Sequence, residues 1–260
     1  MIRFSANLGF LWTELPLVQA ISAAKANGFE AVEVHWPYDV PAEDLNGALA
    51  KADIPLLCLN TRPGNREAGE FGLAALPGRE AEARAAIDEA LDYARAVNAR
   101  YVHVMAGLGE GLFAHNTFVA NLDHALNRAS DLGLTILIEP INHLDVPGYF
   151  LGSFVQAADI IVAFDSPNLK MMFDCYHAEK SGEDIQEILP ELLHLIRHIQ
   201  FASPEGRAAP KLDDPWFQGI LETLETVGWG QPIGAEYKTN GATEETLGWM
   251  GCRTSVQDRS

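Results

Sequence analysis

The sequence is short of basic residues and of cysteine, and it has no long apolar run. Lys and Arg number 18 against 36 Asp and Glu, so the formal net charge of the 260-residue chain is −18. Phosphate binding depends on clusters of Lys and Arg, and their scarcity predicts that the protein has no nucleic-acid partner. Since no apolar run approaches the ~18 residues that a membrane span requires, we expect no membrane partner.

The three cysteines, Cys58, Cys175 and Cys252, are odd in number and share no metal-site spacing. They indicate reduced thiols in a cytosolic protein rather than a disulfide framework. Residues 2–6 already show the apolar alternation of a strand, where a signal peptide would have a charged region and an apolar run. We therefore expect a cytoplasmic protein.

Short β-like runs alternate with amphipathic helices along the whole chain. The predicted strands are Arg3–Leu8, Ala31–His35, Pro55–Asn60, Tyr101–Met105, Thr135–Glu139, Leu169–Phe173, His198–Phe201 and Pro232–Tyr237. The predicted helices are Glu14–Asn27, Ala42–Ala52, Arg79–Val97, Phe118–Leu132, Gly152–Phe164, Gly182–Leu193, Pro215–Val227 and Thr243–Met250. Most of the strands are short and apolar, which is typical of parallel strands covered on both faces.

Eight strands alternating with helices predict an α/β fold, a (β/α)₈ TIM barrel, in one domain that spans residues 1–260. An open doubly wound sheet is the alternative. It is disfavoured because no Gly-x-Gly-x-x-Gly turn follows the first strand. The segments 60–78 and 202–214 are long and rich in Gly and Pro, and such loops in a barrel are usually lids or binding loops.

Oxygen-bearing side chains stand at the ends of four successive predicted strands, where the chemistry of a barrel is located. They are Glu139, Asp174, Gln200 and Glu236. A single acid at such a place commonly caps the next helix, but three carboxylates that converge would repel one another unless a cation lies among them. An all-oxygen ligand set favours Mg²⁺ or Mn²⁺ and disfavours zinc.

A metal ion flanked by two carboxylates suits proton transfer next to a carbonyl group. One carboxylate removes the proton from the α-carbon, and a second group returns a proton to the adjacent carbon. If Glu139 and Glu236 approach the substrate from different sides, they can share these two roles.

Short segments spread over most of the chain carry a family resemblance. They are Arg3–Leu8, Pro37–Asp39, Ala68–Glu70, Leu76–Glu80, Ile138–Asn142, Asp174–His177, His198–Gln200 and Gly234–Lys238. In combination they resemble the hydroxypyruvate isomerase family, which belongs to the xylose-isomerase-like barrels. The resemblance implies that Glu139 and Glu236 are the acid/base pair and that Glu139, Asp174, Gln200 and Glu236 hold the metal ion.

The resemblance also implies a reaction, the interconversion of hydroxypyruvate and tartronate semialdehyde through an enediol. Related members isomerise 2-oxotetronate, and the segments 60–64 and 103–107 are similar to that second branch. The segment 201–214 departs from the family pattern, and so does His35, where the family more often has an apolar or aromatic residue. Hydroxypyruvate is therefore the first expectation for the substrate and 2-oxotetronate the second.

An anionic oxo acid that enters an acidic protein needs positive charge at the mouth of the barrel. Arg207, Arg66 and Lys238 lie in or beside the mouth loops, and Lys238 shares the face of Glu236 if the last strand persists. The alternative for each is a solvated surface charge. His177 and His35 are further candidates for substrate binding, each with a purely structural alternative.

Asn60, at the end of the third predicted strand, completes the predicted substrate-binding set. Glu33 is expected to point away from His35 and to form a structural ion pair. We interpret His103 as a satisfied core histidine and expect His198 to face the barrel interior beneath the site. Two aromatic residues, Trp12 and Trp36, form either an apolar wall around the ligand or ordinary packing.

Three other functions compete with an isomerase. A lyase or epimerase, such as an inosose dehydratase, would use a similar metal centre. A DNA-repair endonuclease on a related barrel would need several metal-binding histidines and a basic face, and a barrel could also bind a sugar acid without turning it over. The sequence leaves the oligomeric state open, with a homo-oligomer as one alternative.

Overall fold

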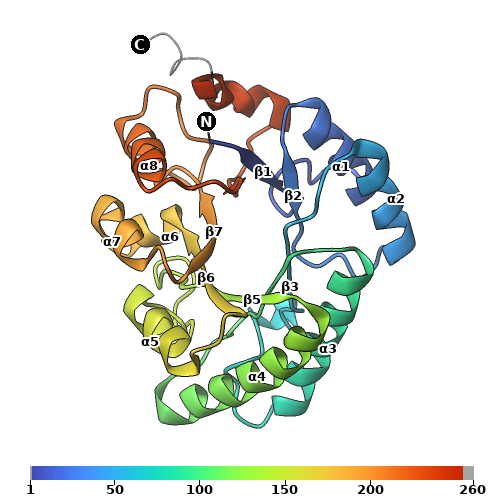
Figure 1. Cartoon of the computed structure of the whole chain (residues 1–260), viewed down its shortest axis with the longest axis vertical. Coiled ribbons are helices and arrows are strands. Elements are labelled where there is room, and N and C mark those ends of the chain that lie inside the picture. The colour runs from blue at the N-terminus through green and yellow to red at the C-terminus, as the bar shows by residue number, and fades with distance from the viewer. Residues whose placement is uncertain (1, 254–260) are drawn as a thin grey trace.

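The computed structural model describes residues 2–253, with side chains up to Gly251. Its eight parallel strands are β1 Phe4–Asn7, β2 Ala31–Glu33, β3 Cys58–Asn60, β4 Tyr101–His103, β5 Thr135–Ile138, β6 Leu169–Asp174, β7 Ile196–Phe201 and β8 Ile233–Ala235. They pair in the order β2-β1-β8-β7-β6-β5-β4-β3, and they form a ring in Figure 1.

The two end strands of this order, β2 and β3, close the ring through backbone hydrogen bonds. Val32 forms a parallel bridge with Leu56, and the N–H of Asn60 donates to the carbonyl of His35 over 2.8 Å. The predicted TIM barrel is therefore confirmed, and all eight predicted strands are present.

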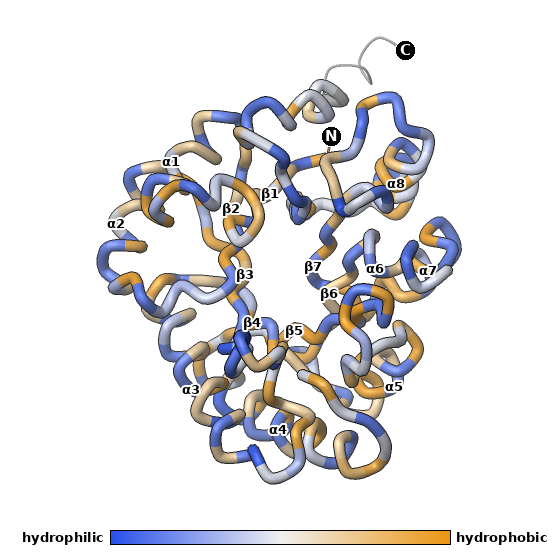
Figure 2. Tube along the Cα trace, turned by 180° about the vertical axis from the view of Figure 1, so that it is seen from behind, coloured by the Kyte–Doolittle hydropathy of each residue, from blue (hydrophilic) through white to orange (hydrophobic). Residues whose placement is uncertain are grey.

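Helices surround the barrel on its outer side (Figure 1). They are α1 Leu17–Ala26, α2 Ala42–Ala52, α3 Glu80–Ala96, α4 Gly111–Leu132, α5 Phe154–Phe164, α6 Cys175–Lys180, α7 Ile185–Leu192 and α8 Pro215–Thr226, with the 3₁₀ helices η1 Arg66–Ala68 and η2 Thr243–Arg253. Polar and apolar stretches alternate along these helices in Figure 2. Helix α3 shows the cause, because its buried residues, from Ala83 to Ala94, recur at helical spacing.

The expected helix Gly182–Leu193 corresponds to α7, which starts three residues later, at Ile185, and the structure has a further helix, α6, that was not expected. Helix α6 follows β6 without a loop, and the carboxylate of Asp174 caps it by accepting from the N–H of Tyr176 over 2.9 Å. Gly182, with φ of 81°, separates α6 from α7. Helix α4 begins at Gly111, seven residues before the expected start at Phe118.

The interior of the barrel changes from apolar to polar along the strands. An apolar cluster fills the part near the strand starts; it consists of Ala31, Leu57, Cys58, Tyr101, Leu137 and Met172. Beyond this cluster the buried side chains are polar: Ser5, Asn7, Glu33, His103, Glu139, Asp174, His198, Gln200 and Glu236. Because side chains alternate along a strand, the residues between them face outward into the larger core that the helices cover.

Among the described residues, none of the helices has both the length and the apolar character needed to cross a membrane.

Candidate active site

The four side chains predicted at the strand ends lie together at one end of the barrel. Asp174 ends β6 and pairs in register with Gln200 of β7, while Glu139 and Glu236 directly follow β5 and β8. All four are buried, with exposed fractions between 0% and 7%. Parallel strands of a barrel end on the same side, so residues far apart in the sequence become neighbours.

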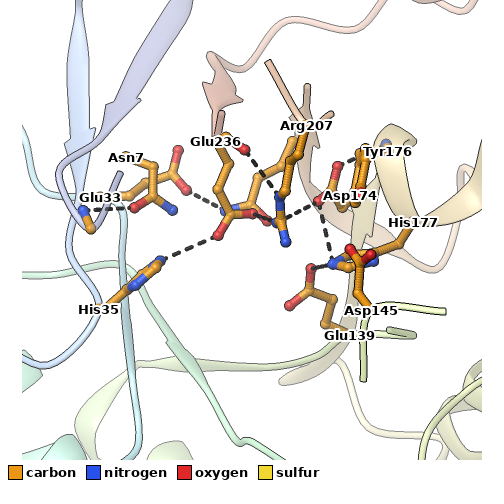
Figure 3. A network of polar contacts seen from close by, with 12 residues as sticks. Asn7, Glu33, His35, Glu139, Asp145, Asp174, Tyr176, His177, Arg207 and Glu236 are labelled. Atoms are coloured by element: carbon orange, nitrogen blue, oxygen red, sulfur yellow. Dashed lines mark hydrogen bonds and ion pairs between the residues drawn. The ribbon is translucent and has the colours of Figure 1, made fainter. Parts of the chain in front are cut away.

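Arg207 lies between two of these carboxylates, as Figure 3 shows. Its Nη2 is 3.3 Å from Oδ2 of Asp174 and 3.1 Å from Oε2 of Glu236. The guanidinium also lies over the rings of Phe10 and Tyr176, each 4.8 Å from the ring centroid. The loop after β7 thus supplies a guanidinium that contacts two of these carboxylates.

The carboxylates differ in their protonation because their neighbours differ. Burial, together with the charges of Glu236 and Asp174, raises the pKa of Glu139 well above its usual value. Burial also raises the pKa of Asp174 to about 7, although Arg207 opposes this shift. For Glu236, burial acts in the same direction but Arg207 and His35 outweigh it, and they lower the pKa to about 2.

His177 joins Glu139 and Asp174 in a group that could hold a metal ion. One ligand atom from each of the three residues lies within 4.8 Å of the other two. The Nε2 of His177 is 3.7 Å from Oδ2 of Asp174 and 3.9 Å from Oε1 of Glu139.

The contacts of Nδ1 of His177 determine which of its two ring nitrogens carries the proton. Nδ1 accepts from the backbone N–H of Asn142 over 3.4 Å, and burial lowers the pKa of the imidazole to about 3, so the ring is neutral. The remaining proton therefore sits on Nε2, which faces the two carboxylates. In this tautomer His177 is a hydrogen-bond donor, and a ligand role would require the proton to move.

The predicted ligand set fits a divalent cation. Oε1 of Glu139 and Oε1 of Gln200 are buried oxygens without a hydrogen-bond partner in the described part of the chain. Buried acceptors are normally satisfied, so a missing partner at two of the predicted ligand positions is consistent with a bound positive group. Carboxylate and amide oxygens are the donors that Mg²⁺ and Mn²⁺ prefer.

His35, a predicted substrate-binding residue, reaches the site from the end of β2. Its Nε2 is 3.2 Å from Oε1 of Glu236, and its ring packs against Phe10 and Trp36. Gly9 covers the ring so closely that a Cβ atom there would lie 2.3 Å from Nδ1 of His35. A glycine is therefore required at this position for His35 to keep its place.

Two aromatic residues named as an apolar wall have different positions. Trp36 borders the mouth next to His35 and carries the guanidinium of Arg66 4.7 Å above its ring. Trp12 is 1% exposed and packs in the core against Phe29. For Trp12 the packing alternative is the correct one.

Lys238 does not share the face of Glu236, because β8 ends at Ala235. Its side chain is exposed, while its backbone N–H donates to the carbonyl of Arg207 over 2.7 Å. Asn60 stands at the end of β3 as expected and is half-buried. Its carbonyl accepts from the hydroxyl of Tyr38.

His103 is buried as expected, but the prediction of a satisfied core histidine is wrong. Neither of its ring nitrogens has a hydrogen-bond partner among residues 2–253, and Nδ1 lies 3.7 Å from Oε2 of Glu139. The predicted strand continued to Met105, whereas β4 ends at His103. A shorter strand would have placed this histidine at the mouth with the other site residues.

Glu33 also differs from its expected position. Residues two apart on a strand share a face, so Glu33 points into the barrel on the same side as His35. It lies beneath the site, where its carboxylate contacts Ser5, His198 and Gln200. The contact that corresponds to the expected ion pair is the one with His198, whose Nε2 is 2.9 Å from Oε2 of Glu33, and His198 faces the interior as predicted.

Comparisons with known proteins agree with this architecture. The family model described as xylose isomerase-like TIM barrel matches residues 21–251. A 2-oxo-tetronate isomerase from Cupriavidus necator is 38% identical, over 96% of this chain and 98% of that protein. A putative hydroxypyruvate isomerase from Xenopus laevis is 39% identical, over 96% of this chain and 94% of that protein.

A solved structure is similar over the same range. The crystal structure described as AP endonuclease, family 2, from Brucella melitensis has 33% sequence identity and a TM-score of 0.91, covering 96% of this chain and 98% of that one. The two isomerases confirm the resemblance that the sequence motifs indicated. The chain therefore belongs to the xylose isomerase-like TIM barrel family.

Proposed function

We propose that the protein is a metal-dependent isomerase of small hydroxy-oxo acids, with hydroxypyruvate as the first substrate and 2-oxotetronate as the alternative. One observation carries this proposal. Glu139, Asp174, Gln200 and Glu236 meet at the mouth of the barrel, in a chain that is 38–39% identical to proteins named for these two reactions.

The predicted ligands of the metal ion are Glu139, Asp174, Gln200 and Glu236, and Mg²⁺ or Mn²⁺ suits this oxygen-rich set. When bound, such an ion polarises the carbonyl and hydroxyl oxygens of the substrate and lowers the barrier to an enediol.

The residues of the chain supply the proton transfers. In hydroxypyruvate, one carboxylate of the Glu139–Glu236 pair takes a proton from C3, and the other returns a proton to C2. At the same time an O–H proton passes from the C3 oxygen to the C2 oxygen, which yields tartronate semialdehyde with no change in composition. Nε2–H of His177 faces the carboxylates of Glu139 and Asp174 and is placed to donate to a substrate oxygen.

The carboxylate of the substrate requires a positive partner in this negatively charged mouth. Arg207 is the candidate, because its side chain already contacts Asp174 and Glu236 and is only 13% exposed. The rings of Phe10 and Tyr176 pack against the guanidinium and limit its contact with water. Lys238 is a weaker candidate, since its side chain points to solvent.

The test is solvent-deuterium incorporation, followed by NMR, with the Mg²⁺- or Mn²⁺-loaded protein and each oxo acid separately. Glu139→Gln and Glu236→Gln should each slow carbon-bound exchange by about 10²–10⁴-fold, the usual contribution of a general acid or base. Glu187→Gln, at an exposed position on α7, is the matched control and should exchange like the unaltered protein. Exchange that continues in both site variants would contradict the paired-carboxylate mechanism, and the faster substrate identifies the branch.

A second candidate function comes from the Brucella melitensis structure, which is named an endonuclease. Two observations disfavour that activity here. The formal net charge is −18, and the carboxylate-rich group that could hold a metal ion contains a single histidine. Cleavage of DNA with an abasic site by the metal-loaded protein would favour the endonuclease, whereas isomerisation of an oxo acid without DNA cleavage supports our proposal.

The same incubations separate a lyase or epimerase from an isomerase, if a cyclic polyol such as an inosose is included as a third substrate. The oxo-acid substrate, the absence of nucleic-acid and membrane partners, and the cytoplasmic location remain predictions from the sequence.

A further inference from the structure

A buried carboxylate lies directly beneath the predicted metal site. Glu33 is 2% exposed, and it enters from β2 on the side of the polar network opposite His177 (Figure 3). It is not a predicted ligand or an acid/base residue. A buried carboxylate is costly unless hydrogen bonds satisfy it, so its contacts indicate what it does.

The two oxygens of Glu33 accept hydrogen bonds from side chains of β1 and β7 inside the barrel. Oε1 accepts from the hydroxyl of Ser5 over 2.5 Å. Oε2 accepts from Nε2 of Gln200 over 2.7 Å. A charge-assisted hydrogen bond of this length, removed from water, is among the stronger ones in a protein.

The bond to Glu33 determines which way the amide of Gln200 is turned. Because the nitrogen of the amide faces Glu33, its oxygen is directed away from Glu33. That oxygen is buried and has no hydrogen-bond partner within the described residues. Gln200 pairs in register with Asp174. An amide oxygen at this position, free of other hydrogen bonds, can act as a metal ligand.

An ion pair with His198 explains the burial of Glu33 less well than the hydrogen bond from Gln200 does. Nε2 of His198 is 2.9 Å from Oε2 of Glu33, but this nitrogen has no hydrogen bond of acceptable geometry with any described residue. The same oxygen does accept a well-formed hydrogen bond from Gln200. The contact with the amide is therefore the better defined of the two.

Gly234 on β8 provides the space that the side chains of Glu33 and Gln200 occupy. A Cβ atom at Gly234 would lie 2.4 Å from Oε1 of Glu33 and 2.8 Å from Cγ of Gln200. Both distances are too short for any side chain, so residue 234 must be glycine if Glu33 and Gln200 are to keep their positions.

We propose that Glu33 is a positioning residue, which holds the amide of Gln200 so that its oxygen faces the metal ion. The proposal rests on the proposed function, in which Gln200 is a ligand. Removing an outer hydrogen-bond partner of a ligand typically costs about 10–100-fold in metal affinity.

The experiment is a double-mutant cycle on Mn²⁺ binding to metal-free protein, measured by electron paramagnetic resonance of the unbound ion. Glu33→Leu should weaken binding about 10–100-fold in the unaltered chain and should have little further effect when Gln200→Leu is already present. Glu33→Gln, which keeps an acceptor oxygen, should recover most of the affinity. Equal losses in both backgrounds, or no loss in either, would overturn the proposal.

Gly234→Ala provides a second variant in case Glu33→Leu does not fold. It disturbs the same pair without removing a charge, and it should weaken Mn²⁺ binding only while Gln200 is present. The NMR signal of the Gln200 side-chain amide supplies a readout without metal. This signal should shift toward that of a solvated amide in Glu33→Leu, and an unchanged signal would contradict the positioning role.

These measurements separate two failures. If the unaltered protein binds no Mn²⁺, the metal-dependent function fails, while the amide signal still shows whether Glu33 orients Gln200. If the protein binds Mn²⁺ and Gln200→Leu weakens binding but Glu33→Leu does not, only the positioning role fails.

Discussion

Asp174→Asn should make the metal-free protein more stable at alkaline pH while it removes a predicted metal ligand. Burial raises the pKa of Asp174 to about 7 from the usual 3.8, so the folded protein holds the neutral form. Above about pH 7 the folded state must accept a charge that the unfolded state carries at little cost. The variant avoids this cost because Asn is neutral at every pH.

The expected gain follows from proton linkage. The raised pKa of the folded state means that this group stabilises the protein below pH 3.8 and that the contribution is lost as the pH rises to about 7. At about 1.4 kcal/mol per pKa unit, the loss is on the order of 4 kcal/mol at pH 8. Asn also caps helices well, so the bond from Asp174 to the N–H of Tyr176 can be replaced.

The assay is urea unfolding in the presence of a chelator, at about pH 8 and about pH 5. The stability difference between the variant and the unaltered protein should be large at pH 8 and smaller at pH 5, where more of Asp174 is protonated. Asp184→Asn is the matched control, because Asp184 caps α7 with the same geometry at an exposed position. A variant less stable than the parent at pH 8 would show that attraction to Arg207 outweighs burial, and the reasoning would be refuted.

Two further predictions concern the walls of the site. Gly9→Ala places a Cβ atom 2.3 Å from Nδ1 of His35, so the ring must shift away from Glu236. We expect at least ~10-fold lower kcat/KM with unchanged Mn²⁺ affinity. An unchanged kcat/KM would mean that His35 is not needed at this position. Burial lowers the pKa of His103 to about 3, so its stabilising contribution is present above pH 6.5 and is lost as the pH falls. His103→Leu should therefore flatten the fall in unfolding free energy between about pH 6.5 and pH 4 by up to ~1.4 kcal/mol per pH unit, and parallel urea-unfolding curves for the two proteins would contradict this.

The barrel itself could be predicted because its signals are local and repeated. Each strand is a short apolar run between helical segments, and eight such units leave few alternatives for a chain of this length. The predicted bounds of α2, Ala42–Ala52, agree with the structure. Helix α6 was missed because it has only six residues and begins directly at Asp174, so no loop composition separates it from the strand.

The candidate site could be predicted only as far as the strand ends were correct. Glu139, Asp174 and Glu236 lie where the apolar runs stop, and the structure brings them together. Most strands were predicted too long, and in β4 and β8 this error moved His103 away from the mouth and Lys238 towards it.

Contacts between distant strands could not be predicted from one sequence. The hydrogen bond from Gln200 to Glu33 joins residues 167 positions apart, and it depends on the register of β1, β2, β7 and β8 around the closed barrel. No periodicity within a single strand carries that information. The same holds for the position of Arg207, whose φ of 54° places it in the left-handed region within an irregular loop.

The charges at the mouth connect the stability prediction with the proposed function. Three carboxylates, Glu139, Asp174 and Glu236, face one guanidinium, that of Arg207. His103 and His177 add no positive charge, because burial keeps both rings neutral. Burial, together with the neighbouring negative charges, makes Glu139 and Asp174 hold their protons more tightly, which destabilises the metal-free protein above neutral pH. A divalent cation bound at the proposed site would remove that penalty. The negative charge that destabilises the metal-free protein would therefore strengthen metal binding.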